Sequence, residues 1–137
     1  MRATTRGIYA LKAILALAAA DSDRDNPMAL HLIAENEQIS TEFLQQIFFR
    51  LRKAGLIAAY RGPGGGFYLV KDKSEISVLS VLEAAGESME ISPCAITRTG
   101  AKSPCSRFVG CNAGQFWTSL ENEIRSYASS RTLADLL

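Results

Sequence analysis

The segment from Ser40 to Val70 most constrains the fold, because it holds an apolar helical repeat, a glycine-rich turn and two short apolar runs in succession. Apolar residues at helical spacing predict a helix over residues 41–54, with Ser40 as its N-cap and Gly55 as its stop. The buried stripe of this helix would consist of Leu44, Ile47, Phe48 and Leu51. Residues 56–60 and 67–70 then predict two strands, joined by the turn RGPGGG at residues 61–66.

Two further helices are expected before this segment. Thr4 or Thr5 can cap a first helix that runs to about Ala20, with an apolar stripe at helical spacing. A polar loop at residues 21–27 separates it from a short helix expected over residues 30–37. Two short helices joined by a tight turn, the second with a polar outer side, predict a helix-turn-helix, and the hairpin that follows makes it a winged helix.

The charges of this region suit a nucleic acid. The net charge of the chain is only +1, but residues 1–73 hold ten basic and seven acidic residues, whereas residues 74–137 hold five and seven. Residues 43–71 contain no acidic residue at all. A basic helix face followed by a basic turn fits duplex DNA, since the helix can enter the major groove while the turn lies on the neighbouring backbone.

The C-terminal part predicts a sensor loop and a dimer contact. A short helix capped by Ser77 would end at Gly86, and a long loop with little periodicity follows. The last helix, over residues 113–131, carries an apolar stripe that we interpret as a dimer contact, formed by Trp117, Leu120, Ile124 and Tyr127. An apolar tail would cap that contact, formed by Leu133, Leu136 and Leu137. We therefore expect a mainly α fold with a small β-hairpin, divided into a winged-helix domain at 1–86, a cysteine-containing loop at 87–112 and a dimerisation helix with its tail at 113–137.

Three cysteines fall within the expected loop, at Cys94, Cys105 and Cys111, with the spacing C-x10-C-x5-C. An odd number argues against a structural disulfide framework, and the lack of a CxxC pair argues against a zinc knuckle. The residues alone leave a metal site, a redox thiol or plain burial open. The chain has one histidine and no recognisable nucleophile–base pair, and RGPGGG lacks the Lys-Ser/Thr of a phosphate-binding loop, so we do not expect an enzyme.

No apolar run approaches the roughly 20 residues that a membrane span requires. Arg6 and Lys12 interrupt the early apolar residues, which does not match a signal peptide. We therefore expect a cytoplasmic protein without a membrane partner.

The sequence resembles a known family in several places. The opening RATTRGIYALKAILALA, the segment ISTEFLQQIFFRLRKAGLI, the wing YRGPGGGFYL and a cysteine loop before a final helix are similar to the Rrf-type bacterial transcription regulators. That family includes the cluster-assembly and nitric-oxide-responsive repressors. The resemblance implies a homodimeric winged-helix repressor that binds a pseudo-palindromic DNA operator, with three cysteines holding an iron–sulfur cluster (2Fe–2S or 4Fe–4S) that controls DNA affinity.

The resemblance also implies roles for single residues. Base edges would be read by Glu42, Gln45 and Gln46. From their charge, Arg50, Arg52 and Lys53 are expected to bind phosphates, with an ion pair to an acidic neighbour as the alternative for Arg52. On the wing, Arg61 would enter a minor groove while Gly64 and Gly65 allow close backbone approach. The cluster ligands would be Cys94, Cys105 and Cys111.

The fourth cluster ligand is not apparent in the sequence. Some relatives have a histidine where this chain has Gly114, and others have a carboxylate near the position of Ile8. Neither residue can bind iron, and His31 lies at the start of the second expected helix and is not expected to be a ligand. The fourth ligand would then be solvent, a small thiol or a residue of the other protomer.

Two alternatives remain from the sequence. In the first, a regulator of the same fold acts without a cluster, through thiol oxidation or a partner protein. In the second, the winged helix is a protein interaction module that does not bind DNA.

Overall fold

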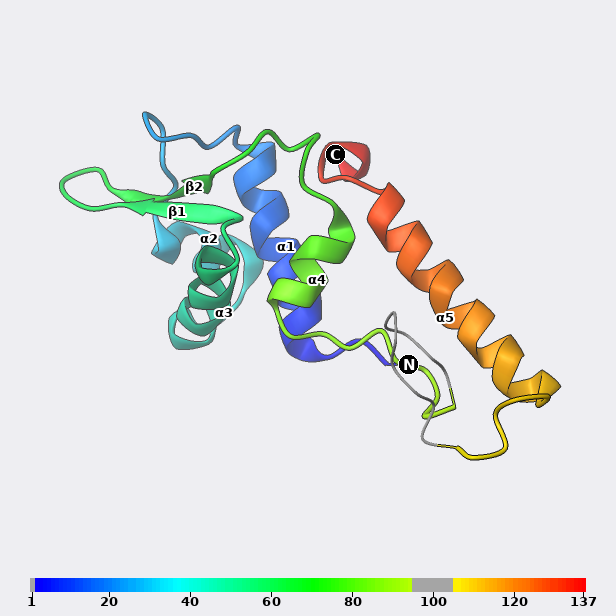
Figure 1. The fold of residues 1–137 in the computed structure, drawn as a ribbon. Coiled ribbons are helices and arrows are strands. Elements are labelled where there is room, and N and C mark those ends of the chain that lie inside the picture. Colours follow the sequence, from blue (N-terminus) through cyan, green and yellow to red (C-terminus); the bar gives the residue numbers. More distant parts are fainter. Residues whose placement is uncertain (1, 95–104) are drawn as a thin grey trace.

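The computed structural model of the chain describes residues 2–94 and 105–137 (Figure 1). Three helices and a hairpin form the N-terminal part, and two helices and a short 3-10 helix follow. In chain order they are α1 (Thr5–Ala19), α2 (Leu30–Glu37), α3 (Thr41–Lys53), β1 (Ile57–Tyr60), β2 (Gly66–Leu69), α4 (Val78–Ala84), α5 (Asn112–Ser130) and η1 (Ala134–Leu136). The predicted winged helix-turn-helix, mainly α with a small hairpin, is confirmed.

Hydroxyl side chains cap the N-termini of three of the helices. Thr4 Oγ1 accepts a hydrogen bond from Gly7 N at 3.2 Å, and Ser77 Oγ accepts one from Ser80 N at 3.1 Å. Ser40 Oγ accepts from Phe43 N at 3.2 Å, as the sequence predicted for α3. Each bond satisfies one of the backbone N–H groups that a helix start leaves without an intrahelical acceptor.

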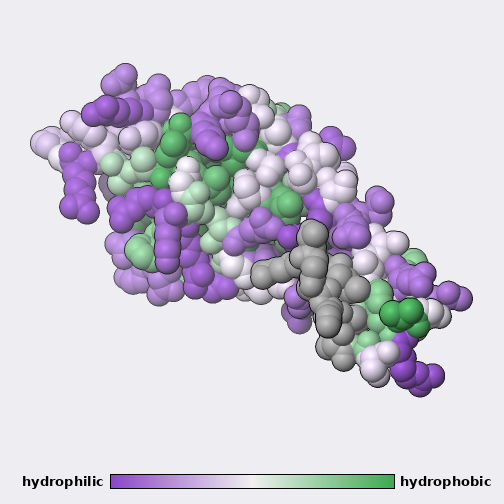
Figure 2. Space-filling view, in the orientation of Figure 1, coloured by the Kyte–Doolittle hydropathy of each residue, from purple (hydrophilic) through white to green (hydrophobic). Residues whose placement is uncertain are grey.

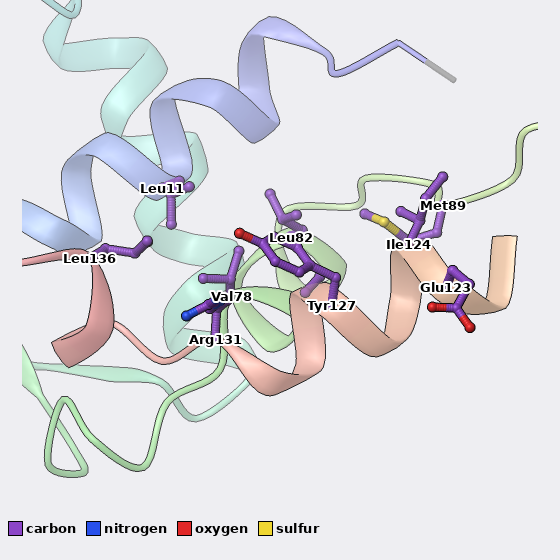
Figure 3. Close-up of a pocket in the computed structure, with 10 residues that line it drawn as sticks. Leu11, Val78, Leu82, Met89, Glu123, Ile124, Tyr127, Arg131 and Leu136 are labelled. Carbon is purple, nitrogen blue, oxygen red and sulfur yellow. The ribbon is translucent and has the colours of Figure 1, made fainter. Parts of the chain in front are cut away.

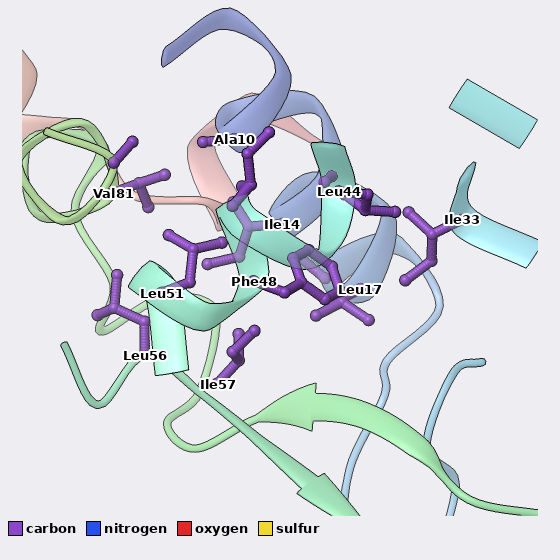
Figure 4. Packing of buried hydrophobic residues seen from close by; sticks show 14 of the residues in the cluster. Ala10, Ile14, Leu17, Ile33, Leu44, Phe48, Leu51, Leu56, Ile57 and Val81 are labelled. Carbon is purple, nitrogen blue, oxygen red and sulfur yellow. The ribbon is translucent and has the colours of Figure 1, made fainter. Parts of the chain in front are cut away.

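The core lies between α1, α3 and the hairpin (Figure 4). The predicted stripe of α3 is confirmed, because Leu44, Ile47, Phe48 and Leu51 are all buried. Phe48 meets Phe67 of β2 edge to face, with ring centroids 4.9 Å apart. This aromatic contact joins the inner face of α3 to the hairpin, so the two elements that would meet DNA form one packed unit.

The hairpin is also attached to the chain that precedes α2. Strands β1 and β2 pair antiparallel, with Ile57 opposite Leu69. On the other edge of β2, Phe67 exchanges two backbone hydrogen bonds with Met28, each 2.8 Å long. The base of the wing is therefore held from both sides.

The end of the chain returns to the N-terminal part. Leu133 has no exposed surface and belongs to the core, and its N–H donates to Ile76 O at 3.0 Å. The tail was expected to lie at a dimer contact, but only Leu136 and Leu137 are exposed. Leu133 is buried in its own chain because the turn after α5 pairs Thr132 with Ser77 and directs the next residue inward.

Helix α5 packs on α4 and extends away from the body of the molecule (Figure 1). Arg125 on α5 donates to Glu83 Oε1 on α4 at 2.8 Å. None of the helices in the described ranges 2–94 and 105–137 is both long and apolar enough to cross a membrane.

Candidate nucleic-acid interface

The outer face of α3 is exposed along its whole length. All six residues expected to contact DNA from this helix are exposed, namely Glu42, Gln45, Gln46, Arg50, Arg52 and Lys53. The opposite face is buried in the core, so the helix presents a continuous polar surface on a fixed support. Much of the molecular surface in this region is hydrophilic (Figure 2).

An open hollow of about 700 Å³ runs along this face of α3. It is lined by Arg6, Glu42, Phe43, Gln45, Gln46, Phe49, Arg50 and Lys53. Phe43 packs edge to face on Tyr9 of α1, with ring centroids 5.9 Å apart, whereas Phe49 is 60% exposed. Of these two phenylalanines, Phe43 therefore belongs to the packing of α1 and α3, and Phe49 faces the hollow.

The wing places its own predicted residues at an exposed, tight turn. Arg61 and Gly64 are exposed and Gly65 is partly exposed. Gly64 has a φ of +74°, which glycine adopts readily. A Cβ on Gly65 would lie 2.3 Å from Tyr60 O. The turn can therefore adopt this conformation only with glycine at position 65.

The three cysteines lie on either side of residues 95–104, which fall outside the described residues. Cys94 and Cys111 are partly buried, and Cys105 is exposed. Cys111 is the N-cap of α5, and its Sγ accepts from Gly114 N at 3.5 Å. Within the described residues, no group of three His, Cys, Asp or Glu side chains lies close enough to hold a metal ion. The thiols have the chemistry of iron–sulfur ligands, but the described residues do not bring all three of them together.

Comparison with known proteins identifies the family. A model of the Rrf2 family, described as iron-dependent transcriptional regulator, matches residues 3–137. The chain is 40% identical to the HTH-type transcriptional regulator IscR of Yersinia enterocolitica, over 100% of this chain and 79% of that relative. The chain belongs to the Rrf2 family of transcriptional regulators. Its relatives are regulators rather than enzymes, and the family resemblance seen in the sequence is confirmed.

Solved structures of Rrf2-type regulators have the same fold. T. potens IscR is 26% identical, with a TM-score of 0.73 over 99% of this chain and 85% of that one. The oxidized form of Staphylococcus aureus CymR is 28% identical, with a TM-score of 0.73 over 99% of this chain and 95% of that one.

The apolar stripe of α5 is divided between two environments. Trp117 and Leu120 are 39% and 36% exposed. Ile124 is partly buried and, with Tyr127, lines an apolar groove of about 580 Å³ between α5, α4 and α1 (Figure 3). Leu11 and Leu136 lie at one end of this groove, and Met89 lies at the other.

Two glutamates of this Rrf2 regulator have roles that the sequence did not suggest. Acidic residues were expected mainly on solvated faces, but Glu87 and Glu121 are 8% and 0% exposed. Glu87 Oε2 accepts hydrogen bonds from Thr4 N and Thr4 Oγ1, at 3.0 and 2.8 Å. Glu121 Oε2 accepts from Ile91 N at 3.3 Å. Both carboxylates thus hold the chain just before Cys94, one against α1 and the other against α5.

The burial of only one of these two glutamates could have been inferred from the sequence. Glu121 stands four residues after Trp117 and seven before Ala128, so it lies on the apolar stripe of its helix, where a solvated carboxylate is not expected. Glu87 follows a helix-ending glycine, and its partner Thr4 is distant in the chain, so no local pattern indicates its burial.

Proposed function

We propose that this regulator binds duplex DNA as a homodimer through α3 and the wing, acts as a repressor in the cytoplasm, and holds an iron–sulfur cluster on Cys94, Cys105 and Cys111 that sets its DNA affinity. The observation that carries the DNA role is the exposed face of α3, which is polar and largely basic while its other face is buried. This face and the exposed wing turn belong to one packed unit, as a helix in the major groove with a turn on the backbone requires.

On this face, Glu42, Gln45 and Gln46 are proposed to read base edges. Glutamine can form two hydrogen bonds with adenine, and glutamate accepts one from cytosine. Phosphates are assigned to Arg50, Arg52 and Lys53, and the minor groove to Arg61, with Gly64 and Gly65 allowing the wing to approach closely. Phosphate contacts fix the position of the protein, whereas base contacts fix its sequence preference.

The DNA role is tested by binding at several salt concentrations. A duplex is first selected from random-sequence DNA by the wild-type protein, and a scrambled duplex of the same length serves as reference. We expect Gln46→Ala to lower affinity for the selected duplex by about tenfold and to leave affinity for the scrambled duplex unchanged. Arg61→Ala should lower the slope of log affinity against log salt by about one. A wild-type affinity that does not depend on salt would support an interaction module instead.

A homodimer is proposed because α5 exposes large apolar side chains along a helix that extends from the body. Trp117, Leu120, Ile124 and Tyr127 would contact the second copy, which would place two α3 helices on the two half-sites of a pseudo-palindrome. Sedimentation of the wild type should give a dimer, and Leu120→Glu should give a monomer with a helical spectrum unchanged. Asn122→Glu is the matched control, since Asn122 is also exposed on α5 but lies opposite the apolar stripe. A wild-type monomer at micromolar concentration would contradict the dimer.

The cluster proposal depends on the donor chemistry of the cysteine segment, residues 87–112. An iron–sulfur cluster supplies a redox-sensitive centre bound through thiolates. The chain holds the cysteine segment near both ends, because Glu121 binds the backbone at Ile91, shortly before Cys94, and Cys111 is the N-cap of α5. The start of a helix favours a negatively charged ligand atom such as a thiolate sulfur. Movement of this segment would change the placement of α5, and through α5 the spacing of the two α3 helices.

The test is quantification of iron and sulfide on anaerobically purified protein. We expect cluster-type absorption in the wild type, loss of that absorption in Cys105→Ala, and retention in the neighbouring control Ser106→Ala. A colourless protein that binds DNA normally would favour thiol oxidation without a metal. That alternative has support from one relative in this fold, the S. aureus CymR structure described as an oxidized form.

A further inference from the structure

Two arginine side chains from different helices converge beside Gly86, at the end of α4. A Cβ built on Gly86 would lie 2.9 Å from Arg6 Nη2 and 3.3 Å from Arg50 Nη1. The two nitrogens are therefore no more than about 6 Å apart. Gly86 has a φ of +84°, and its lack of a side chain leaves the space that the two guanidinium groups occupy.

No carboxylate of the described residues forms an ion pair with either arginine. The ion pairs within residues 2–94 and 105–137 involve Lys12, Lys73 and Arg125, and neither Arg6 nor Arg50 is among them. Glu87 follows Gly86 directly, but it accepts hydrogen bonds from Thr4 instead. Glu42 lines the same hollow without forming an ion pair to either arginine.

Arg6 also carries an unsatisfied donor. Its Nε is buried and has no hydrogen-bond partner among the described residues. A buried donor without an acceptor, next to a second positive charge, costs free energy, and such groups in a native fold require an explanation. An anion between the two guanidinium groups would offset the repulsion, because its oxygens can accept hydrogen bonds from both.

We propose that Arg6 and Arg50 form a binding site for one backbone phosphate of duplex DNA. The site deepens the DNA-binding role proposed above and rests on it. Both arginines line the hollow along the outer face of α3, so a duplex read by Gln45 and Gln46 would pass this position. Arg6 belongs to α1, outside the helix-turn-helix and the wing, and thus adds a third element to the interface. Its contact would be independent of base sequence.

The experiment compares Arg6→Gln with wild type on the selected and the scrambled duplex, over a range of salt concentrations. We expect Arg6→Gln to lower affinity by about five- to tenfold on both duplexes and to reduce the salt slope by about one. Arg6→Lys keeps the charge but loses the planar guanidinium group, so its affinity should lie between those of wild type and Arg6→Gln. Lys73→Gln removes the same charge at a residue that pairs with Asp21 and does not line the hollow, and should leave affinity and slope unchanged.

The pair is tested by combining the two substitutions. If Arg6 and Arg50 bind one phosphate, Arg6→Gln should have a smaller effect in an Arg50→Gln background than alone. Thermal unfolding of each variant shows whether it is folded, and Arg6→Lys carries the test if Arg6→Gln is not. Arg6→Gln and Arg6→Lys that both bind with wild-type affinity and slope would overturn the phosphate site and leave the DNA role standing. A wild-type protein that does not bind DNA would remove both.

Discussion

Glu87 caps the first turn of α1 through Thr4, although the two residues are 83 positions apart in the chain. Glu87 Oε2 lies 3.0 Å from Thr4 N and 2.8 Å from Thr4 Oγ1, and Oε1 lies 3.2 Å from Thr4 N. A carboxylate at a helix N-terminus is favoured both by the unsatisfied N–H groups and by the helix dipole. The first residue of the cysteine segment is therefore bound to the start of the helix that carries Arg6.

Removing the Glu87 carboxylate should destabilise the fold. Glu87→Ala leaves Thr4 N–H without its acceptor in a partly buried site, which typically costs about 1–3 kcal/mol. The measurement is the free energy of unfolding in urea. Glu90→Ala, three residues further on and exposed, is the matched control and should change stability by less than about 0.5 kcal/mol. Equal stabilities for the two variants would show that the Thr4–Glu87 contact contributes nothing.

Gly7→Ala should lower the free energy of unfolding when Glu87 is present and raise it when Glu87 is replaced by alanine. A Cβ on Gly7 would lie 1.8 Å from Glu87 Oε2, so Gly7→Ala must displace the carboxylate from Thr4. The other close atoms, at 2.9 and 3.4 Å, also belong to Glu87. We expect Gly7→Ala to destabilise the wild type, but to stabilise Glu87→Ala by about 0.5–1 kcal/mol, since alanine is the better helix residue. A double-mutant cycle in urea measures this, and additive effects would contradict it.

These contacts show where sequence reasoning reached its limit. The stripe of α3, its Ser40 cap and the turn at Gly64 depend on neighbours within a few residues, and local spacing predicted them. The positions of Glu87 and Leu133 depend on partners far along the chain. A pattern shows which side chain is apolar, but not which surface covers it, and so Leu133 was assigned to a dimer contact.

The candidate site likewise has some features that local spacing predicts and others that depend on distant parts of the chain. Exposure of the α3 and wing residues follows from helical periodicity, which places them opposite the buried stripe. The convergence of Arg6 and Arg50 follows from how α1 packs on α3 and from the space beside Gly86, and neither is visible in a linear pattern.

Gly66 should tolerate no side chain at the start of β2. A Cβ there would lie 2.4 Å from Met28 O, which is backbone and cannot swing aside. Gly66→Ala should therefore break the paired hydrogen bonds between Met28 and Phe67 and lower stability by about 1–3 kcal/mol. Gly64→Ala is the control, because Gly64 has open space and only the cost of its positive φ, about 1–2 kcal/mol. Thermal unfolding should give a lower Tm for Gly66→Ala than for Gly64→Ala.

Asp135 should make stability depend on acid pH. The backbone N–H of Thr132, and then its side chain, hold the pKa of Asp135 below its ordinary value of 3.8. A carboxyl whose pKa is lower in the folded state stabilises the protein above its unfolded pKa. That stability is lost as the pH falls from 3.8 through the folded pKa. Asp135→Asn should thus be less stable than wild type at neutral pH, with the difference closing below pH 3.8.

The measurement for Asp135 is urea unfolding across this pH range. Glu123→Gln, on an exposed carboxylate without a hydrogen bond among the described residues, is the control for the loss of one negative charge. A constant difference between wild type and Asp135→Asn at all pH values would contradict the assignment to Thr132.

Leu133 should stabilise the winged-helix core from the far end of the chain. Its side chain has no exposed surface. Leu133→Ala should therefore leave a cavity and lower the free energy of unfolding by about 2–5 kcal/mol. Leu137→Ala, at a residue 55% exposed, should cost less than about 0.5 kcal/mol. Urea unfolding of dilute protein, repeated at several protein concentrations, separates a core contribution from a dimer contribution. If Leu133 acted only through the dimer, its effect would fall with dilution. Because it packs in its own chain, we expect the same loss at every concentration.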